Sequence, residues 1–275
     1  MQVFGYARVL CFALLITGCV AAEPVPLSIR GTLATVEVRL NGKGPFRMLI
    51  DTGATACSFS AEAAKAIGAT PQFRVVDLTP GNSRVASATD SVQVELGNHV
   101  ETRVQFSWQE SVLGSVMGLQ TDGVLGQSFL SRFDYTLDYR AKRILLDEEK
   151  PAQGKQTVRV AFERADGRMI VKAANREDGA IRLVLDSAAS HLSLWRSNTR
   201  VTPNSLAQAL TYAGRRSVAM ARMSYLAIGG DVIRGLDVLI PEETVTGGGE
   251  DGLLPASLFR SVYVSNSKSY VEFTR

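Results

Sequence analysis

The chain has 275 residues, of which 45% are hydrophobic and 21% charged, a balance that excludes a largely disordered protein and fits one or two domains. Its 30 Lys and Arg against 27 Asp and Glu leave a formal net charge of +3, which disfavours a nucleic-acid partner. With only 2 His and 3 Cys, the chain is poor in the ligands of a zinc site, so neither a metal nor a cofactor is expected.

The N-terminus has the character of a targeting segment. Residues 9–18 are apolar, too short for a membrane span of about 20 residues but typical of a secretory signal core. Cys19 follows Ile16-Thr17-Gly18, which resembles the bacterial lipobox, in which the cysteine receives lipid and becomes the mature N-terminus. We therefore expect a lipoprotein signal peptide over residues 1–18 and an exported protein, in the periplasm or on the outer membrane. Ordinary signal cleavage after Ala22 is the alternative.

The predicted elements that follow are mostly strands. Apolar and polar residues alternate with period two, the pattern of half-buried strands, over residues 36–40, 92–96, 104–108 and 133–139. Short helices are predicted at 61–67, with Ser60 as N-cap and Gly68 as its end, and at 127–132 and 204–210. The expected fold class is all-β.

Two motifs occur twice, in the same order. Residues 45–60 (PFRMLIDTGATACSFS) match residues 180–194 (AIRLVLDSAASHLSL), and residues 122–133 (DGVLGQSFLSRF) match residues 251–262 (DGLLPASLFRSV). The spacing between the motifs is also similar in the two copies. Matched motifs at matched spacing indicate an internal duplication.

A polar segment divides the two copies. Residues 147–157 (DEEKPAQGKQT) are charged and contain Pro and Gly, as a linker does. We therefore expect a first lobe over residues 19–150 and a second over residues 151–275, each of ordinary domain size.

An aspartate ends an apolar strand in each copy. Asp51 follows Met48-Leu49-Ile50, and Asp186 follows Leu183-Val184-Leu185. A single buried carboxylate is costly and has a raised pKa. Two carboxyl groups about 3 Å apart instead share one proton, so that the ionised one can take a proton from water while the protonated one polarises a peptide carbonyl.

These motifs carry a family resemblance. With DTGAT at 51–55 and Val124-Leu125-Gly126 downstream, the sequence resembles aspartic proteases of the retropepsin/pepsin type, and specifically their two-lobed bacterial members, from about residue 27 to residue 275. The resemblance implies a bilobal fold of two duplicated β-barrel-like lobes and a catalytic dyad of Asp51 and Asp186. It also implies a peptide or protein substrate held extended between the lobes of a monomeric pseudo-dimer.

The same resemblance assigns supporting roles around the dyad. Thr52 and Ser187 would join the two loops through hydroxyl hydrogen bonds, and Gly53 would offer its N–H to a carboxylate. Ala188 would occupy the matching place in the second lobe. The turn residues 79–82 lie where a flap over the substrate is expected.

The second copy departs from the family pattern at two positions. Ala188 and Pro255 both stand where the family has Gly. Ala is strained if φ is positive there, and Pro removes an N–H donor. Three readings stay open: an active pair, a non-catalytic peptide-binding module at the cell envelope, and a homodimer of first lobes. The retained Asp186 and Ser187 favour the active pair.

Other chemistry-bearing residues have a structural interpretation. Asp122 and Asp251 open repeated loops and are expected to be turn residues. Ser190 precedes His191, but neighbours on a strand point to opposite faces, which disfavours a nucleophile and base pair and predicts a solvated histidine.

Overall fold

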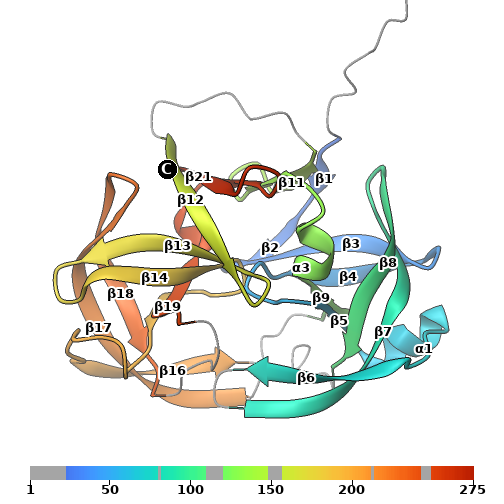
Figure 1. Ribbon diagram of the computed structural model, residues 1–275, viewed down its shortest axis with the longest axis horizontal. Helices are drawn as coiled ribbons and strands as arrows, with labels where there is room; N and C mark the ends of the chain where they lie inside the picture. The colour runs from blue at the N-terminus through green and yellow to red at the C-terminus, as the bar shows by residue number, and fades with distance from the viewer. Residues whose placement is uncertain (1–22, 80–81, 110–119, 148–156, 212–213, 243–248) are drawn as a thin grey trace, which may run out of the picture.

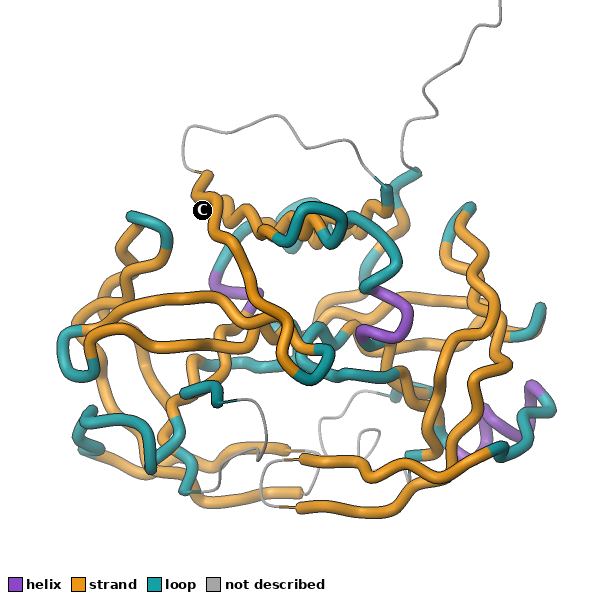
Figure 2. Tube along the Cα trace, in the orientation of Figure 1, coloured by secondary structure: helices purple, strands orange, loops and turns teal. Residues whose placement is uncertain are grey.

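The computed structural model describes residues 23–79, 82–109, 120–147, 157–211, 214–242 and 249–275. The predicted signal peptide with Cys19 and most of the predicted linker lie outside these residues. Within them strands predominate and helices are short (Figure 2). No helix in this part of the chain is long and apolar enough to cross a membrane.

The first lobe is one eight-stranded sheet in the order β2-β3-β4-β9-β5-β8-β7-β6, and a β3–β7 pairing joins strands from its two ends. Its β4 and β9 run parallel, as do β5 and β8. The strands are β2 (Ser28–Arg30), β3 (Leu33–Leu40), β4 (Lys43–Ile50), β5 (Cys57–Phe59), β6 (Phe73–Thr79), β7 (Asn82–Leu96), β8 (His99–Trp108) and β9 (Gly123–Leu125).

The second lobe repeats the last seven strands of this order, from β3 to β6, as β13-β14-β19-β15-β18-β17-β16, with an equivalent β13–β17 pairing. The strands are β13 (Arg168–Asn175), β14 (Gly179–Asp186), β15 (Leu192–Leu194), β16 (Ser205–Thr211), β17 (Gly214–Ile228), β18 (Asp231–Ile240) and β19 (Gly252–Pro255). Matching order and matching parallel pairs, β14 with β19 and β15 with β18, agree with the duplication inferred from the motifs.

A six-stranded run joins the lobes, with the order β1-β11-β10-β20-β21-β12 (Figure 1). Each half of the chain contributes three strands, and the halves meet where Tyr135 pairs with Val264. The strands are β1 (Val25–Pro26), β10 (Tyr135–Asp138), β11 (Arg143–Leu146), β12 (Thr157–Ala165), β20 (Ser261–Ser265) and β21 (Tyr270–Thr274). The two halves are therefore connected by backbone hydrogen bonds as well as by the chain.

Two of the three predicted helices form. α1 (Ala61–Ile67) begins where Ser60 Oγ accepts the Ala63 N–H at 3.1 Å and ends at Gly68 in the left-handed conformation, both as predicted. α3 (Gln127–Leu130) is shorter than the predicted 127–132. A 3₁₀ turn, η1 (Ala256–Leu258), takes the matching place in the second lobe.

The predicted helix at 204–210 is wrong. These residues form β16, which pairs antiparallel with β17 from Ser205 opposite Met220 to Thr211 opposite Gly214. The Ala, Leu and Gln residues of this segment favour a helix locally, but the long neighbouring strand offers a complete ladder of backbone partners. Leu206, 75% exposed, shows that apolar burial did not decide its conformation.

Candidate active site

The two aspartates lie at equivalent points of the two lobes. Asp51 follows β4, and its N–H donates to the Leu125 carbonyl of the parallel neighbour β9 at 3.1 Å. Asp186 is the last residue of β14 and lies opposite Pro255 of β19. A buried parallel pair of strands thus fixes where each aspartate leaves the sheet.

Each aspartate is held by the loop that follows it. Oδ1 of Asp51 accepts the N–H of Gly53 at 2.9 Å and of Ala54 at 3.0 Å. Oδ1 of Asp186 accepts the N–H of Ala188 at 2.7 Å and of Ala189 at 3.0 Å. Two backbone donors on one oxygen fix the orientation of each carboxyl group and favour its ionised form.

Four hydrogen bonds join the two loops reciprocally. The Thr52 hydroxyl donates to the Leu185 carbonyl at 2.8 Å and accepts the Ser187 N–H at 2.9 Å. The Ser187 hydroxyl donates to the Ile50 carbonyl at 2.7 Å and accepts the Thr52 N–H at 3.0 Å. We call these four hydrogen bonds of Thr52 and Ser187 the clasp. Both side chains are fully buried, so the clasp orders two loops that are 135 residues apart in sequence.

The clasp brings Asp186 against the first-lobe loop. A Cβ added to Gly53 would lie 2.9 Å from the Asp186 carboxyl carbon, so a side chain at position 53 would collide with that carboxyl group. Asp51 is 4% exposed, and Asp186 is half-buried. Burial, followed by the negative charge of Asp51, raises the pKa of Asp186 above its ordinary range, against the opposing effect of its two backbone donors. The pair therefore retains a proton at pH values where an isolated aspartate is ionised.

Ala188 causes no backbone strain. Its φ is not in the left-handed region, nor is that of Gly53, its counterpart. Its N–H makes the 2.7 Å bond to Asp186, and its methyl group packs against a small apolar cluster of Leu33, Leu49 and Val124. The reason for expecting a distorted second loop is thus removed.

Pro255 also leaves no polar group without a partner. In the first lobe the Gly126 N–H donates to Cys57 Sγ at 3.3 Å. The duplication aligns Gly126 with Pro255 and Cys57 with Leu192, so the donor and its acceptor are both replaced. Losing both partners together avoids the penalty of an unsatisfied buried group. Burial raises the pKa of the Cys57 thiol to about 11, which keeps it neutral.

Asp122 and Asp251 have matching structural contacts. Asp122 Oδ2 accepts the Arg47 N–H at 2.7 Å, and Asp251 Oδ2 accepts the Arg182 N–H at 2.7 Å. These bonds tie the start of β9 to β4 and the start of β19 to β14. Both carboxylates thus cap loops, in agreement with the turn role predicted for them.

Ser190 and His191 contact each other, although the sequence argument placed them on opposite faces. Ser190 Oγ lies 2.8 Å from His191 Nδ1, because the two residues lie in a bend before β15 rather than in a strand. That argument was therefore wrong about geometry. Both side chains are exposed, as predicted for the histidine.

Gln127 contacts the first-lobe loop and was missed by the sequence analysis. It is 2% exposed, its Nε2 donates to the Thr52 carbonyl at 2.8 Å, and its backbone N–H donates to the Ala54 carbonyl at 2.9 Å. A comparison of the repeats could have singled it out, because the duplication aligns the polar Gln127 with the apolar Ala256.

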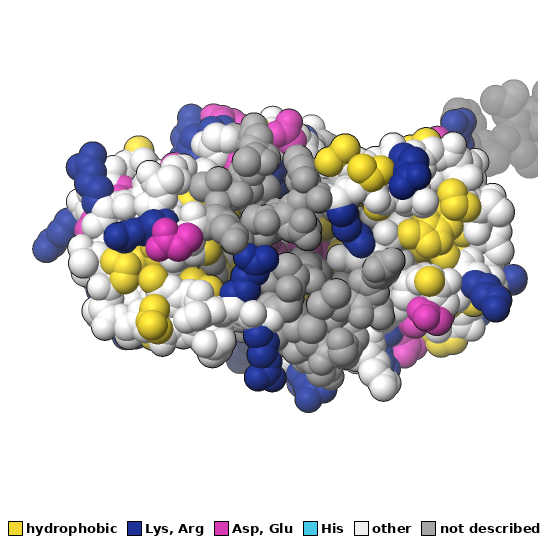
Figure 3. Space-filling view, turned by 90° about the horizontal axis from the view of Figure 1, so that it is seen from below, with side chains coloured by type: hydrophobic (Ala, Val, Ile, Leu, Met, Phe, Trp, Pro, Cys, Tyr) yellow, Lys and Arg dark blue, Asp and Glu magenta, His cyan; other side chains and the backbone are white. Residues whose placement is uncertain are grey.

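A long hairpin from each lobe lies on the same side of the molecule (Figures 1 and 2). β6 and β7 pair up to Thr79 opposite Asn82, at the predicted flap, although residues 80–81 lie outside the described residues. β16 and β17 pair up to Thr211 opposite Gly214. Seen from this side, Lys and Arg side chains lie on both lobes (Figure 3).

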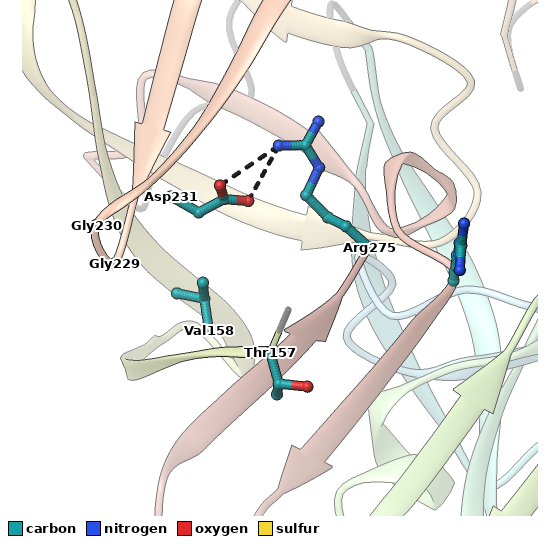
Figure 4. Close-up of a pocket in the computed structure, with 7 residues that line it drawn as sticks. Thr157, Val158, Gly229, Gly230, Asp231 and Arg275 are labelled. Atoms are coloured by element: carbon teal, nitrogen blue, oxygen red, sulfur yellow. Dashed lines mark hydrogen bonds and ion pairs between the residues drawn. The ribbon is translucent and has the colours of Figure 1, made fainter. Parts of the chain in front are cut away.

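A cavity of about 760 Å³ opens elsewhere, between β12 and the turn that joins β17 to β18 (Figure 4). Arg275 and Asp231 line it and form an ion pair at 3.2 Å. None of its lining residues belongs to the aspartate loops. In the described part of the chain, no group of three or more His, Cys, Asp or Glu side chains is placed to hold a metal ion.

Comparisons with known proteins agree with this architecture. Residues 36–129 match the family model described as aspartyl protease. The chain is similar to the aspartic proteinase from Irpex lacteus, at 10% identity and a TM-score of 0.57, over 92% of this chain and 97% of that chain. It also matches a retropepsin-like aspartic protease from Rickettsia conorii at 18% identity and a TM-score of 0.36, over 46% of this chain and 93% of that chain. No curated protein matches.

The fold is therefore the bilobal, all-β fold of pepsin-like proteins, and the family match falls on the lobe that carries DTGAT. Residues 36–129 are therefore similar to aspartyl proteases, and the chain as a whole has the fold of a pepsin-like proteinase.

Proposed function

We propose that this protein is an exported aspartic endopeptidase in which Asp51 and Asp186 activate one water molecule. The observation that carries the proposal is the reciprocal clasp of Thr52 and Ser187, which sets the Asp186 carboxyl group against the loop of Asp51. The raised pKa of Asp186 supports a pair that shares one proton.

The chemistry follows from that shared proton. The ionised carboxylate takes a proton from water while the water oxygen bonds to the peptide carbonyl carbon, and the protonated carboxyl gives its proton to the carbonyl oxygen. The resulting tetrahedral diol then collapses: one hydroxyl proton returns to a carboxylate, the amide nitrogen receives the other dyad proton, and the C–N bond breaks. The dyad ends with one proton, as it began.

The two hairpins support an extended peptide as substrate. β6 and β16 end their sheets, and each hairpin lies on the same side of the molecule. A peptide lying between them can add strand-like hydrogen bonds to either lobe while its chain continues in both directions. This arrangement favours cleavage within a peptide over removal of a terminal residue.

Substitution of each aspartate tests the dyad. Asp51→Asn and Asp186→Asn keep side-chain size and the Oδ1 acceptor but cannot share a proton, so each should lower peptide cleavage by about 10²–10⁴-fold. The matched control is Asp237→Asn, an exposed residue paired with Arg222. Full activity of either dyad variant would remove that residue from the mechanism. Loss in Asp51→Asn alone would instead indicate a homodimer of first lobes.

Export rests on residues 9–18 and on Cys19. We expect the full-length protein in a bacterial host to incorporate labelled fatty acid and to fractionate with membranes, and Cys19→Ser to lose the label. Labelling that persists in Cys19→Ser would contradict lipidation at this residue.

A further inference from the structure

Gln127 holds the first-lobe loop at two carbonyl groups. As the first residue of α3, it donates its backbone N–H to Ala54 and its side-chain Nε2–H to Thr52, at 2.9 and 2.8 Å. Its side chain is buried, so its hydrogen bond is little weakened by water. The loop of Asp51 is thus held by the Gln127 side chain as well as by the Thr52 and Ser187 hydrogen bonds.

The bond to Thr52 acts on Asp51 through one peptide group. The Thr52 carbonyl and the Gly53 N–H belong to the same peptide unit, and that N–H donates to Asp51 Oδ1 at 2.9 Å. A donor at the carbonyl oxygen polarises the peptide and strengthens the hydrogen bond that its N–H makes. Gln127 therefore stabilises the negative charge of Asp51 without touching the carboxyl group.

The second lobe has no such donor at the matching position. The duplication aligns Gln127 with Ala256, whose methyl group cannot donate to the Ser187 carbonyl. Tyr135 of β10, whose hydroxyl interacts with the Gln127 side chain, is aligned with Val264. The Ala188 N–H still donates to Asp186, but its peptide carries no equivalent side-chain support from position 256. Two carboxyl groups with matching backbone contacts thus have unequal surroundings.

We propose that Gln127 is a positioning residue that makes the dyad share its proton unequally, with Asp51 as the ionised member and Asp186 as the protonated one. The inference rests on the proposed function and assigns its two roles. Asp51 takes the proton of the attacking water, and Asp186 gives its proton to the substrate carbonyl.

The other titratable groups near the dyad do not reverse this assignment. Tyr139, next to β10, has its pKa raised by burial and by the charge of Asp186, and Tyr135 has its pKa raised by burial, so both stay neutral. The positive charge of Arg164 lowers the pKa of Tyr135, but the opposing effect of burial is larger. Asp51 is the charged group that acts on Asp186, and it raises the pKa of that carboxyl.

The test is the pH dependence of kcat/KM for Gln127→Met, which keeps the shape of the side chain and removes its donor. Because the singly ionised dyad becomes less stable, the midpoint of the acid limb should rise by about half a pH unit. The matched control is Ser128→Ala in the same helix. It removes a half-buried hydroxyl that accepts the Cys57 N–H at 2.9 Å and donates to the Gln105 carbonyl at 2.8 Å, but makes no hydrogen bond to residues 51–54.

The outcomes separate the two proposals. A raised acid limb in Gln127→Met and an unchanged one in Ser128→Ala support the inference. If kcat/KM falls equally in both variants without a change in the limb, Gln127 is merely structural and the inference is overturned. If the wild-type protein cleaves no peptide, the proposed function fails and the inference with it.

A measurement on the wild-type protein does not depend on the folding of Gln127→Met. Carboxyl ¹³C NMR of Asp-labelled protein, assigned with Asp51→Asn and Asp186→Asn, reports which group holds the proton between the two protonation steps of the dyad. We expect the shift of an ionised carboxylate for Asp51 and of a protonated carboxyl for Asp186. The reverse assignment, or equal shifts, would overturn the inference.

Discussion

The two lobes share a strand order but differ in how they support their aspartates. The first lobe uses Gly126 with Cys57 and a polar contact from Gln127, whereas the second has Pro255, Leu192 and Ala256 at these positions. The first difference is compensated, since the lost Gly126 donor is matched by the lost Cys57 acceptor, whereas the Gln127 side-chain donor has no replacement at Ala256. A duplicated site can therefore diverge in sequence while both copies keep the same backbone hydrogen bonds to the carboxyl group.

The largest effects are expected at the clasp, where each lobe contributes one hydroxyl group and the stability lost on removing each can be compared. Thr52→Ala removes one hydroxyl that makes two buried hydrogen bonds, and Ser187→Ala does the same from the other side. Each should lower the free energy of unfolding by about 2–4 kcal/mol, because a buried N–H and a buried carbonyl lose their partner. Peptide cleavage should fall in both variants.

Urea unfolding of these two variants measures the comparison directly. Thr52→Ser and Ser187→Thr keep the hydroxyl and should recover most of the stability. A difference of more than about 1 kcal/mol between the two alanine variants would show that the clasp is not shared equally by the lobes.

The pH dependence of stability sharpens the contrast between Asp186 and an ordinary aspartate. Its pKa is raised in the folded protein. Above the unfolded pKa of about 3.9 the unfolded chain binds fewer protons than the folded one, so this group costs stability as the pH rises toward its folded pKa. Asp186→Asn should therefore be more stable than wild type by about 1–3 kcal/mol at pH 7, and the gain should disappear near pH 3.

Thermal unfolding from pH 3 to pH 8 measures the stability of Asp186→Asn relative to wild type. Asp237→Asn is the control at an exposed position, and its free energy of unfolding should stay within about 0.5 kcal/mol of wild type at every pH. A gain of stability in Asp186→Asn that is largest at low pH would contradict the raised pKa.

The smallest effect is expected at Ala188. If the second loop were degenerate because it lacks glycine, Ala188→Gly would restore activity. Since φ at Ala188 is already compatible with an L residue, we expect no rise in kcat/KM and a loss of about 0.5–1 kcal/mol in stability from the freer unfolded chain. A several-fold increase in kcat/KM would revive the interpretation of a damaged second lobe.

The local sequence predicted the structure correctly where a short segment itself supplies the residues that determine its conformation. Helix α1 was predicted with both ends because Ser60 and Gly68 satisfy its terminal backbone groups. Residues 204–210 misled because their conformation depends on β17, whose partnership no local propensity reveals. The bend at Ser190 and His191 was missed for the same reason, since the strand begins only at Leu192.

The sequence by itself determined the duplication, the positions of Asp51 and Asp186 after apolar strands, and the hydroxyl residues beside them, because each is encoded by a repeated local pattern. Only the tertiary structure decided that Thr52 and Ser187 bond reciprocally, that Asp186 lies against Gly53, and that Gln127 supports one loop alone. These are contacts between residues distant in the chain. They depend on how two sheets pack across a shared set of strands, which no local pattern specifies.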